Sequence, residues 1–124
     1  MPALHVVSLG CAKNQVDTEV MLGRLAAHGW RVCADAAHAD VLLVNTCAFV
    51  NAAVREARTA IAALARRKRR SQKLVVCGCL VNRFHHEAAA GHPGVDAWLS
   101  IADETGIAAT LAQFGLPVEG IALL

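Results

Sequence analysis

Residues 4–19 have the sequence LHVVSLGCAKNQVDTE, in which a short apolar run ends in Gly-Cys and a helix-like pattern follows at once. Residues 41–47 (VLLVNTC) and residues 74–79 (LVVCGC) repeat this arrangement, and each precedes another helical pattern. Short apolar runs that alternate with helical patterns are typical of buried strands in α/β proteins. The sequence therefore predicts three equivalent strand-to-helix junctions. Each junction carries one cysteine: Cys11, Cys47 and Cys79.

The remaining elements follow the same alternation. We expect five strands, over residues 4–9, 30–33, 41–46, 74–78 and 95–99. Helices are expected from about Asn14, from Asn51, over 81–90 and from Asp103 to about Phe114. The buried face of the first helix is predicted to contain Val16, Val20, Met21 and Leu25, with Gly29 as its cap, and that of the second Val54, Ala57, Ile61 and Leu64.

Strands that alternate with helices indicate a mainly parallel sheet with right-handed crossovers. We therefore predict an α/β three-layer sandwich, flavodoxin- or Rossmann-like, with five strands in the order 2-1-3-4-5. In that order strands 1, 3 and 4 are neighbours, and these are the strands that precede the three junction cysteines. Neighbouring strands lie about 4.8 Å apart, so the three strand ends would span roughly 10 Å at the carboxyl edge of the sheet.

Length and composition set wider limits. A chain of 124 residues with 56% apolar residues suits one domain with a core of its own. No apolar run reaches the roughly 20 residues of a membrane span, and the start lacks the features of a secretory signal. We expect a soluble, cytoplasmic protein. Residues 66–73 hold six of the twelve basic residues and no acid, which suits either a solvated helix end or contact with RNA or a ribosome surface.

An odd count of five cysteines in such a chain favours ligands or buried thiols over disulfides. Soft thiolates select zinc, Cu(I) or iron–sulfur clusters, and structural zinc usually uses compact Cys-x2-4-Cys pairs, which this sequence lacks. Three separated cysteines suit a [4Fe–4S] cluster with one open iron. Cys33 is expected to be buried or inert, and Cys77 to be buried, with a ligand role as its alternative.

Particular residues add a resemblance. The sequence SLGCAKNQVDTE at 8–19, NTCAFV at 45–50, Gly78-Cys79-Leu80 and GVDAWL at 94–99 resemble the N-terminal domain of the radical-SAM methylthiotransferases along essentially the whole chain. Within that family the Leu-Gly-Cys-x-Lys-Asn and Asn-Thr-Cys-x-Phe forms are similar to the branch that modifies a ribosomal protein, with the tRNA-modifying branch as the alternative.

The resemblance implies a function and its cofactors. Cys11, Cys47 and Cys79 would be the three ligands of an auxiliary [4Fe–4S] cluster whose open iron carries the sulfur to be transferred. The whole enzyme would add a methylthio group to an aspartate of a small-subunit ribosomal protein, using S-adenosylmethionine and a second [4Fe–4S] cluster. No catalytic residue is expected within this chain.

The second cluster requires a Cys-x3-Cys-x2-Cys motif, which does not occur in these 124 residues. We therefore expect a cluster-binding domain over residues 1–115, with 116–124 leading towards radical-SAM and C-terminal domains of a larger enzyme. Two other classes stay open: a zinc-binding interaction domain, with Cys77 or a histidine as fourth ligand, and a nucleotide-binding module, which lacks a Gly-x-Gly-x-x-Gly signature. His85 and His86 are expected on an exposed helix surface, with adventitious metal binding as the alternative. Four polar residues near the junctions suit either capping or orientation of the site: Asn14, Asp17, Asn45 and Asn51.

Overall fold

The computed structural model describes residues 3–9, 12–27, 29–46, 51–78, 80–81, 90–99, 107 and 111. Its elements run β1 (Ala3–Ser8), α1 (Ala12–Ala27), β2 (Arg31–Val32), the 3-10 helix η1 (Ala36–His38), β3 (Val41–Thr46), α2 (Asn51–Arg67), β4 (Lys73–Gly78) and β5 (Ala97–Leu99). In the described part of the chain, no helix is both long enough and apolar enough to cross a bilayer.

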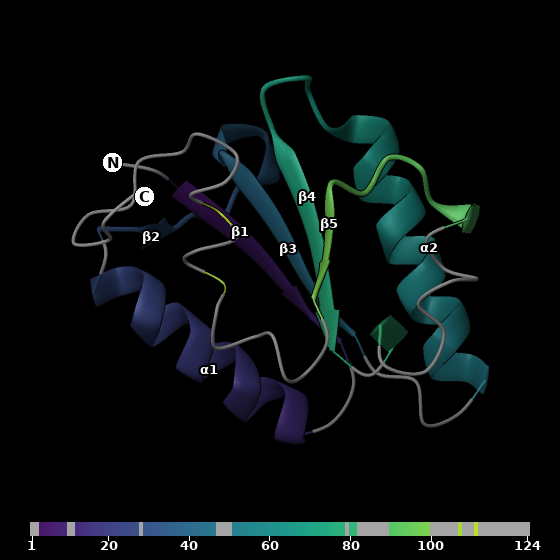
Figure 1. The fold of residues 1–124 in the computed structure, drawn as a ribbon, viewed down its shortest axis with the longest axis horizontal. Helices are drawn as coiled ribbons and strands as arrows, with labels where there is room; N and C mark the ends of the chain where they lie inside the picture. The colour runs from purple at the N-terminus through teal and green to yellow at the C-terminus, as the bar shows by residue number, and fades with distance from the viewer. Residues whose placement is uncertain are drawn as a thin grey trace.

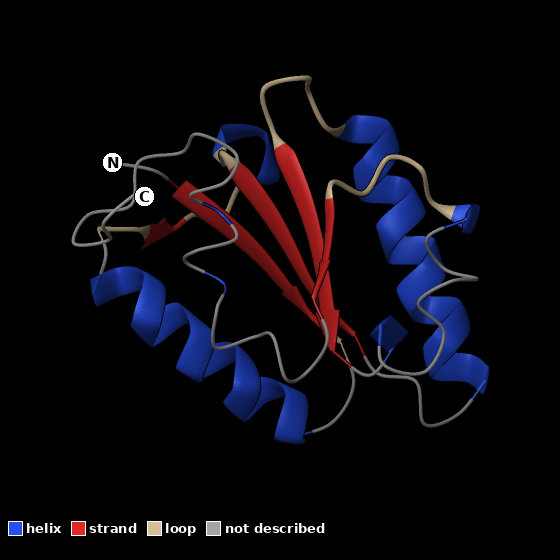
Figure 2. Ribbon diagram, viewed as in Figure 1, coloured by secondary structure: helices blue, strands red, loops and turns tan. Residues whose placement is uncertain are grey.

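The five strands form one sheet in the order β2-β1-β3-β4-β5, and every pair is parallel. The predicted α/β class and strand order are therefore confirmed. Figure 1 shows α1 and α2 on opposite sides of this sheet, and Figure 2 shows the same arrangement as two helical layers around the strands. All six residues of β3 are buried, as its central position in the sheet requires, and the first four of them are apolar.

Two apolar cores separate the sheet from its helices. Alternate residues of β3 point to opposite faces: Val41 and Leu43 join the core under α1, whereas Leu42 and Val44 join the core under α2. Ile107 and Leu111 are helical and fully buried in the first core, which agrees with the expected final helix. The rest of that helix lies outside the described residues. So do residues 82–89 of the helix that is expected after the fourth strand.

The first helix differs from the prediction on its buried face. Met21 and Leu25 are buried as expected, but Val16 and Val20 are 56% and 51% exposed. Each residue advances a helix by about 100°, so Val16 lies about 180° from Leu25 around the axis and cannot share its face. The position that completes the buried face is Thr18, a polar residue that the apolar pattern passed over. On α2, by contrast, Ala57 and Ile61 are fully buried with Val54 and Leu64 packed beside them, as predicted.

Element ends differ by small amounts. α1 begins at Ala12, two residues before the expected start, and β2 and β5 are shorter than predicted. Gly29 closes α1 as expected: its φ is 87°, and its amide donates to the Ala26 carbonyl while that of Trp30 donates to the Leu25 carbonyl. This pair of bonds is a Schellman motif, which needs a left-handed residue at the position of Gly29.

Candidate metal centre at the carboxyl edge of the sheet

Three strands end side by side at the carboxyl edge. Ser8 of β1 pairs with Asn45 of β3, and Thr46 of β3 pairs with Gly78 of β4. The amide of Leu9 continues the first ladder by donating to the Asn45 carbonyl at 2.9 Å. The strand ends therefore lie at the same level of the sheet. Cys47 follows Thr46 directly in sequence, Cys79 follows Gly78, and Cys11 comes two residues after Leu9.

The side chains and backbone of Cys11, Cys47 and Cys79 lie outside the described residues, so the position of the site rests on the chain that leads into each. β3 is hydrogen-bonded to both β1 and β4, so the three ends span two strand spacings, roughly 10 Å. This span is short enough for the three junctions to serve one metal centre.

Two helices begin at this edge. α1 starts at Ala12, directly after Cys11, and α2 starts at Asn51, four residues after Cys47. Figure 1 shows these helix starts at the end of the sheet where the strand arrows point. The amide groups and dipole of a helix N-terminus stabilise negative charge and favour the thiolate over the thiol. The electrostatics of the edge therefore fit thiolate ligands.

A buried polar cluster ties β1, α1 and β3 together beneath the edge. Thr18 of α1 is 6% exposed, and its hydroxyl accepts a hydrogen bond of 2.8 Å from the Asn45 side-chain amide. The same hydroxyl lies 3.2 Å from that of Ser8. Buried polar groups are retained where they bond to one another. For Asn45, one of the four residues with two open interpretations, the structure shows a tether between strand and helix.

Thr46 ties β3 to β4 on both sides of Cys79. Its fully buried hydroxyl donates to the Cys77 carbonyl at 2.7 Å and accepts from the Leu80 amide at 3.2 Å. One side chain thus fixes the residue before Gly78 and the residue after Cys79, while its own neighbour in sequence is Cys47. One signal of this role is visible in the sequence, because Asn45 and Thr46 are polar residues at the end of an otherwise apolar, buried strand.

Gly78 allows the ends of β3 and β4 to approach closely. Its φ is 98°, in the region that glycine adopts without strain. A Cβ at this position would lie 2.5 Å from Asn45 Oδ1 and 2.8 Å from the Thr46 amide nitrogen, too close for any side chain. The residue before Cys79 must therefore be glycine if the two strand ends are to stay in contact.

The other cysteines have different surroundings. Cys77 is fully buried in the apolar core under α1, as expected for a packing role. Cys33 follows Val32, which pairs with Leu4, so it is level with His5 and three residues, or roughly 10 Å, short of the end of β1. Its Sγ donates to the Asp35 carbonyl at 3.1 Å. Cys33 therefore lies well short of the carboxyl edge. Cys77 pairs with Asn45 one residue before the end of β4, but its side chain is buried in the core under α1.

Several predicted positions are outside the described part: the side chains of Asn14, Asp17 and Asn51, and all of His85 and His86. Among the residues that the structure describes, no three His, Cys, Asp or Glu side chains gather as a metal site would require.

Comparison with known proteins shows the family of this chain. Residues 3–100 match the family model described as Uncharacterized protein family UPF0004. A "Ribosomal protein uS12 methylthiotransferase RimO" of Desulfosudis oleivorans is 57% identical over 95 residues, which are 75% of this chain and 22% of that protein. Proteins of the same name from Chloroflexus aurantiacus and Campylobacter jejuni are 45% and 43% identical over 92% and 83% of this chain. The chain spans only 22–25% of the length of these relatives. Because the family model covers most of its length, the chain belongs to the family described as UPF0004.

Proposed function

We propose that this chain is the cluster-binding part of a methylthiotransferase, with Cys11, Cys47 and Cys79 as ligands of one [4Fe–4S] cluster. The observation that carries the proposal is the register of β1, β3 and β4, which ends the three cysteine-bearing strands at one level of one edge. The resemblance of the junction motifs to the radical-SAM methylthiotransferases supports the same assignment. A cluster with three cysteine ligands leaves one iron open to an external sulfur ligand, which is the chemistry that methylthio transfer requires.

The chain's own residues would hold and orient that cluster. The helix starts at Ala12 and Asn51 favour the thiolate form of the nearby cysteines. Thr46 fixes the backbone on both sides of Cys79, and Thr18 fixes Asn45 against α1. Such supporting hydrogen bonds keep ligands in position and tune the affinity of a metal site.

We infer that residues 1–115 form this domain and that residues 116–124 lead to further domains of a larger enzyme. The longer relatives and the absence of a Cys-x3-Cys-x2-Cys motif from these 124 residues support this division. The second [4Fe–4S] cluster and S-adenosylmethionine would belong to a radical-SAM domain. The relatives' names favour ribosomal protein uS12 as the substrate over tRNA. The resemblance implies that an aspartate is the modified residue, and we infer a cytoplasmic enzyme.

Anaerobic reconstitution with iron and sulfide tests the proposal. We expect about four irons per chain and a broad absorption band near roughly 400 nm in the wild type. Cys11→Ala, Cys47→Ala and Cys79→Ala should each lose most of the iron, whereas the matched controls Cys33→Ala and Cys77→Ala should keep it. Equal iron in all five variants would contradict the ligand set. Binding of zinc in place of iron would favour the zinc-binding interaction domain.

A further inference from the structure

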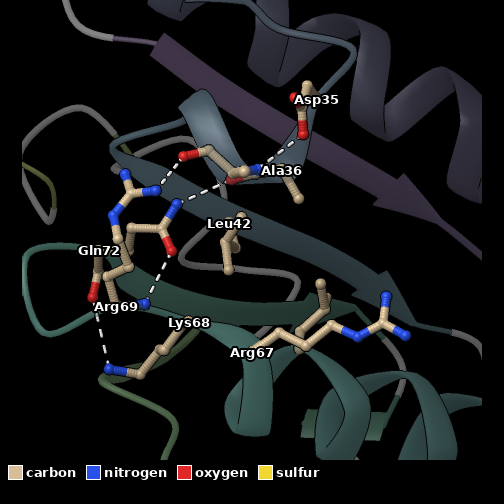
Figure 3. Close-up of a pocket in the computed structure, with 9 residues that line it drawn as sticks. Asp35, Ala36, Leu42, Arg67, Lys68, Arg69 and Gln72 are labelled. Carbon is tan, nitrogen blue, oxygen red and sulfur yellow. Dashed lines mark hydrogen bonds between the residues drawn. The ribbon is translucent and has the colours of Figure 1, made fainter.

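A pocket of about 230 Å³ lies at the opposite, amino-terminal edge of the sheet. It is enclosed by η1, the start of β3, the end of α2 and the turn that leads into β4. Leu42 and Leu64 supply apolar walls, and Arg67, Lys68 and Arg69 supply cationic ones (Figure 3). We call this the amino-edge pocket. It uses none of the residues that surround the cysteine junctions.

Gln72 gives the amino-edge pocket a fixed wall. Its side chain is 2% exposed, and its Nε2 donates to the carbonyls of Ala36 at 2.7 Å and Ala39 at 2.8 Å. Its Oε1 accepts from the Arg69 amide at 2.9 Å, so the turn before β4 is tied to η1 across the pocket. All polar groups of this glutamine amide are thus engaged in shaping the wall. Figure 3 shows its side-chain bonds to Ala36 and Arg69.

The cations around the amino-edge pocket fall into two groups. Lys68 pairs with the Asp96 carboxylate at 3.4 Å, and the Arg69 guanidinium donates to the Ala37 carbonyl. In contrast, three exposed arginines make no ion pair or hydrogen bond with any described residue: Arg66, Arg67 and Arg70. Within the described residues, the segment therefore presents positive charge without an acidic partner beside a preformed pocket. A basic segment that only faced solvent would need no pocket beside it, so the pocket favours a ligand.

The size and lining of the amino-edge pocket limit its ligand. Sites that enclose a whole small molecule usually measure about 300–1,000 Å³, so this pocket admits one unit of a larger ligand that continues over the surface. The described residues that line it include no aromatic side chain, which argues against base stacking and for a sugar–phosphate unit. Arginine guanidinium groups bind phosphate through two parallel hydrogen bonds.

Asp35 favours the ribose of a nucleic acid over the carboxylates of an acidic peptide as the ligand. Its Oδ1 accepts from the Ala37 amide at 2.9 Å and its Oδ2 contacts His38 Nδ1 at 2.7 Å, yet a carboxylate can accept about four hydrogen bonds. A 2′-hydroxyl can donate to the remaining acceptor sites, whereas the ionised side chains of an acidic peptide have no proton to donate to them. We propose that the amino-edge pocket and its flanking arginines bind the sugar–phosphate backbone of single-stranded RNA. This site is independent of the function proposed for the cysteines.

Fluorescence anisotropy with a labelled polyuridylate of about 20 nucleotides tests the site on the metal-free 124-residue chain. The double variant Arg67→Glu/Arg70→Glu should weaken binding at low salt at least about tenfold. The slope of log affinity against log salt concentration should also become shallower by the amount that roughly two phosphate contacts contribute. The control Arg24→Glu/Arg55→Glu changes the net charge equally at exposed positions of α1 and the start of α2, and should weaken binding less than about threefold. Thermal melts of both variants confirm that each is folded.

Three results would overturn the proposal. Equal losses in the two double variants would show that only net charge matters. Equal affinity for a labelled polyglutamate would make the surface a site for acidic protein segments. Equal affinity for polythymidylate, which lacks the 2′-hydroxyl, would show that this group makes no contact with Asp35 and that the site does not select RNA. Loss of RNA binding in the pocket variant would leave the iron content of the reconstituted chain unchanged, so this site and the cluster site can fail separately.

Discussion

Replacing Gly78 by alanine is the sharpest perturbation of the cysteine-bearing edge. Alanine at a φ of 98° costs about 1–2 kcal/mol in backbone strain. The new Cβ would also lie 2.5 Å from Asn45 Oδ1 and 2.8 Å from the Thr46 amide nitrogen, so β3 and β4 must move apart, at a further cost of about 1–3 kcal/mol. We therefore expect Gly78→Ala to lower the free energy of unfolding by about 2–5 kcal/mol.

The assay is thermal and chemical denaturation of the 124-residue chain, followed by reconstitution of the folded variant. A loss of this size corresponds to a fall of roughly 8–20 °C in Tm for a domain of this length. The iron content should fall as well, because the displaced strand ends precede Cys47 and Cys79. The matched control is Gly23→Ala, where a Cβ meets nothing within 4 Å on the exposed face of α1, and which should gain about 0.5–1 kcal/mol. A Gly78→Ala variant as stable and as rich in iron as wild type would refute the close approach.

Three further outcomes follow from the described contacts. Thr46→Val should cost about 1–3 kcal/mol in denaturant melts, because it leaves two buried backbone groups without their partner, and a change below about 0.5 kcal/mol would contradict this tether. Val20→Ser should change stability by less than about 0.5 kcal/mol, whereas Met21→Ala, one residue on, should cost about 2–5 kcal/mol; similar costs would contradict the orientation of α1. The pKa of His92 is lowered by burial and then by the Arg58 charge, so the unfolded chain binds the proton more tightly. The free energy of unfolding is therefore unaffected by this group above the unfolded pKa of 6.5 and falls as the pH drops below that value. In melts at several pH values, His92→Gln should show a smaller fall in stability below pH 6.5 than the wild type, and an equal fall would exclude the effect.

The arrangement of strands was predictable because it depends on local patterns. Each apolar run, such as residues 41–46, is followed by a helical pattern, and parallel sheets with right-handed crossovers leave few strand orders. The prediction for Val16 and Val20 is wrong because apolar residues that lie close in sequence can point to different sides of a helix. Thr18, which bonds to Asn45, occupies the buried face although its side chain is polar.

The sites differ in how far the sequence reveals them. The cysteines could be assigned to one edge because strand order and register place sequence-distant junctions side by side. The roles of Thr46 and Gly78 depend on atoms of the neighbouring strand, and no local pattern contains that information. The amino-edge pocket is closed by the Gln72 side chain, which lies in the turn after α2 and bonds to the backbone at η1. Its partners Ala36 and Ala39 lie 36 and 33 positions earlier in the chain. The basic segment was visible in the sequence, but its pocket was not.

Residue-resolved alkylation of the five cysteines tests the central claim most directly. Anaerobic iodoacetamide treatment followed by mass spectrometry would compare the metal-free chain with the reconstituted chain. The account predicts that Cys11, Cys47 and Cys79 react without the cluster and are protected with it. Cys33, which is partly exposed, should react equally in both states, and the buried Cys77 should react in neither. Protection of Cys33, or continued reaction of any one of the three junction cysteines in a chain that holds four irons, would contradict the site.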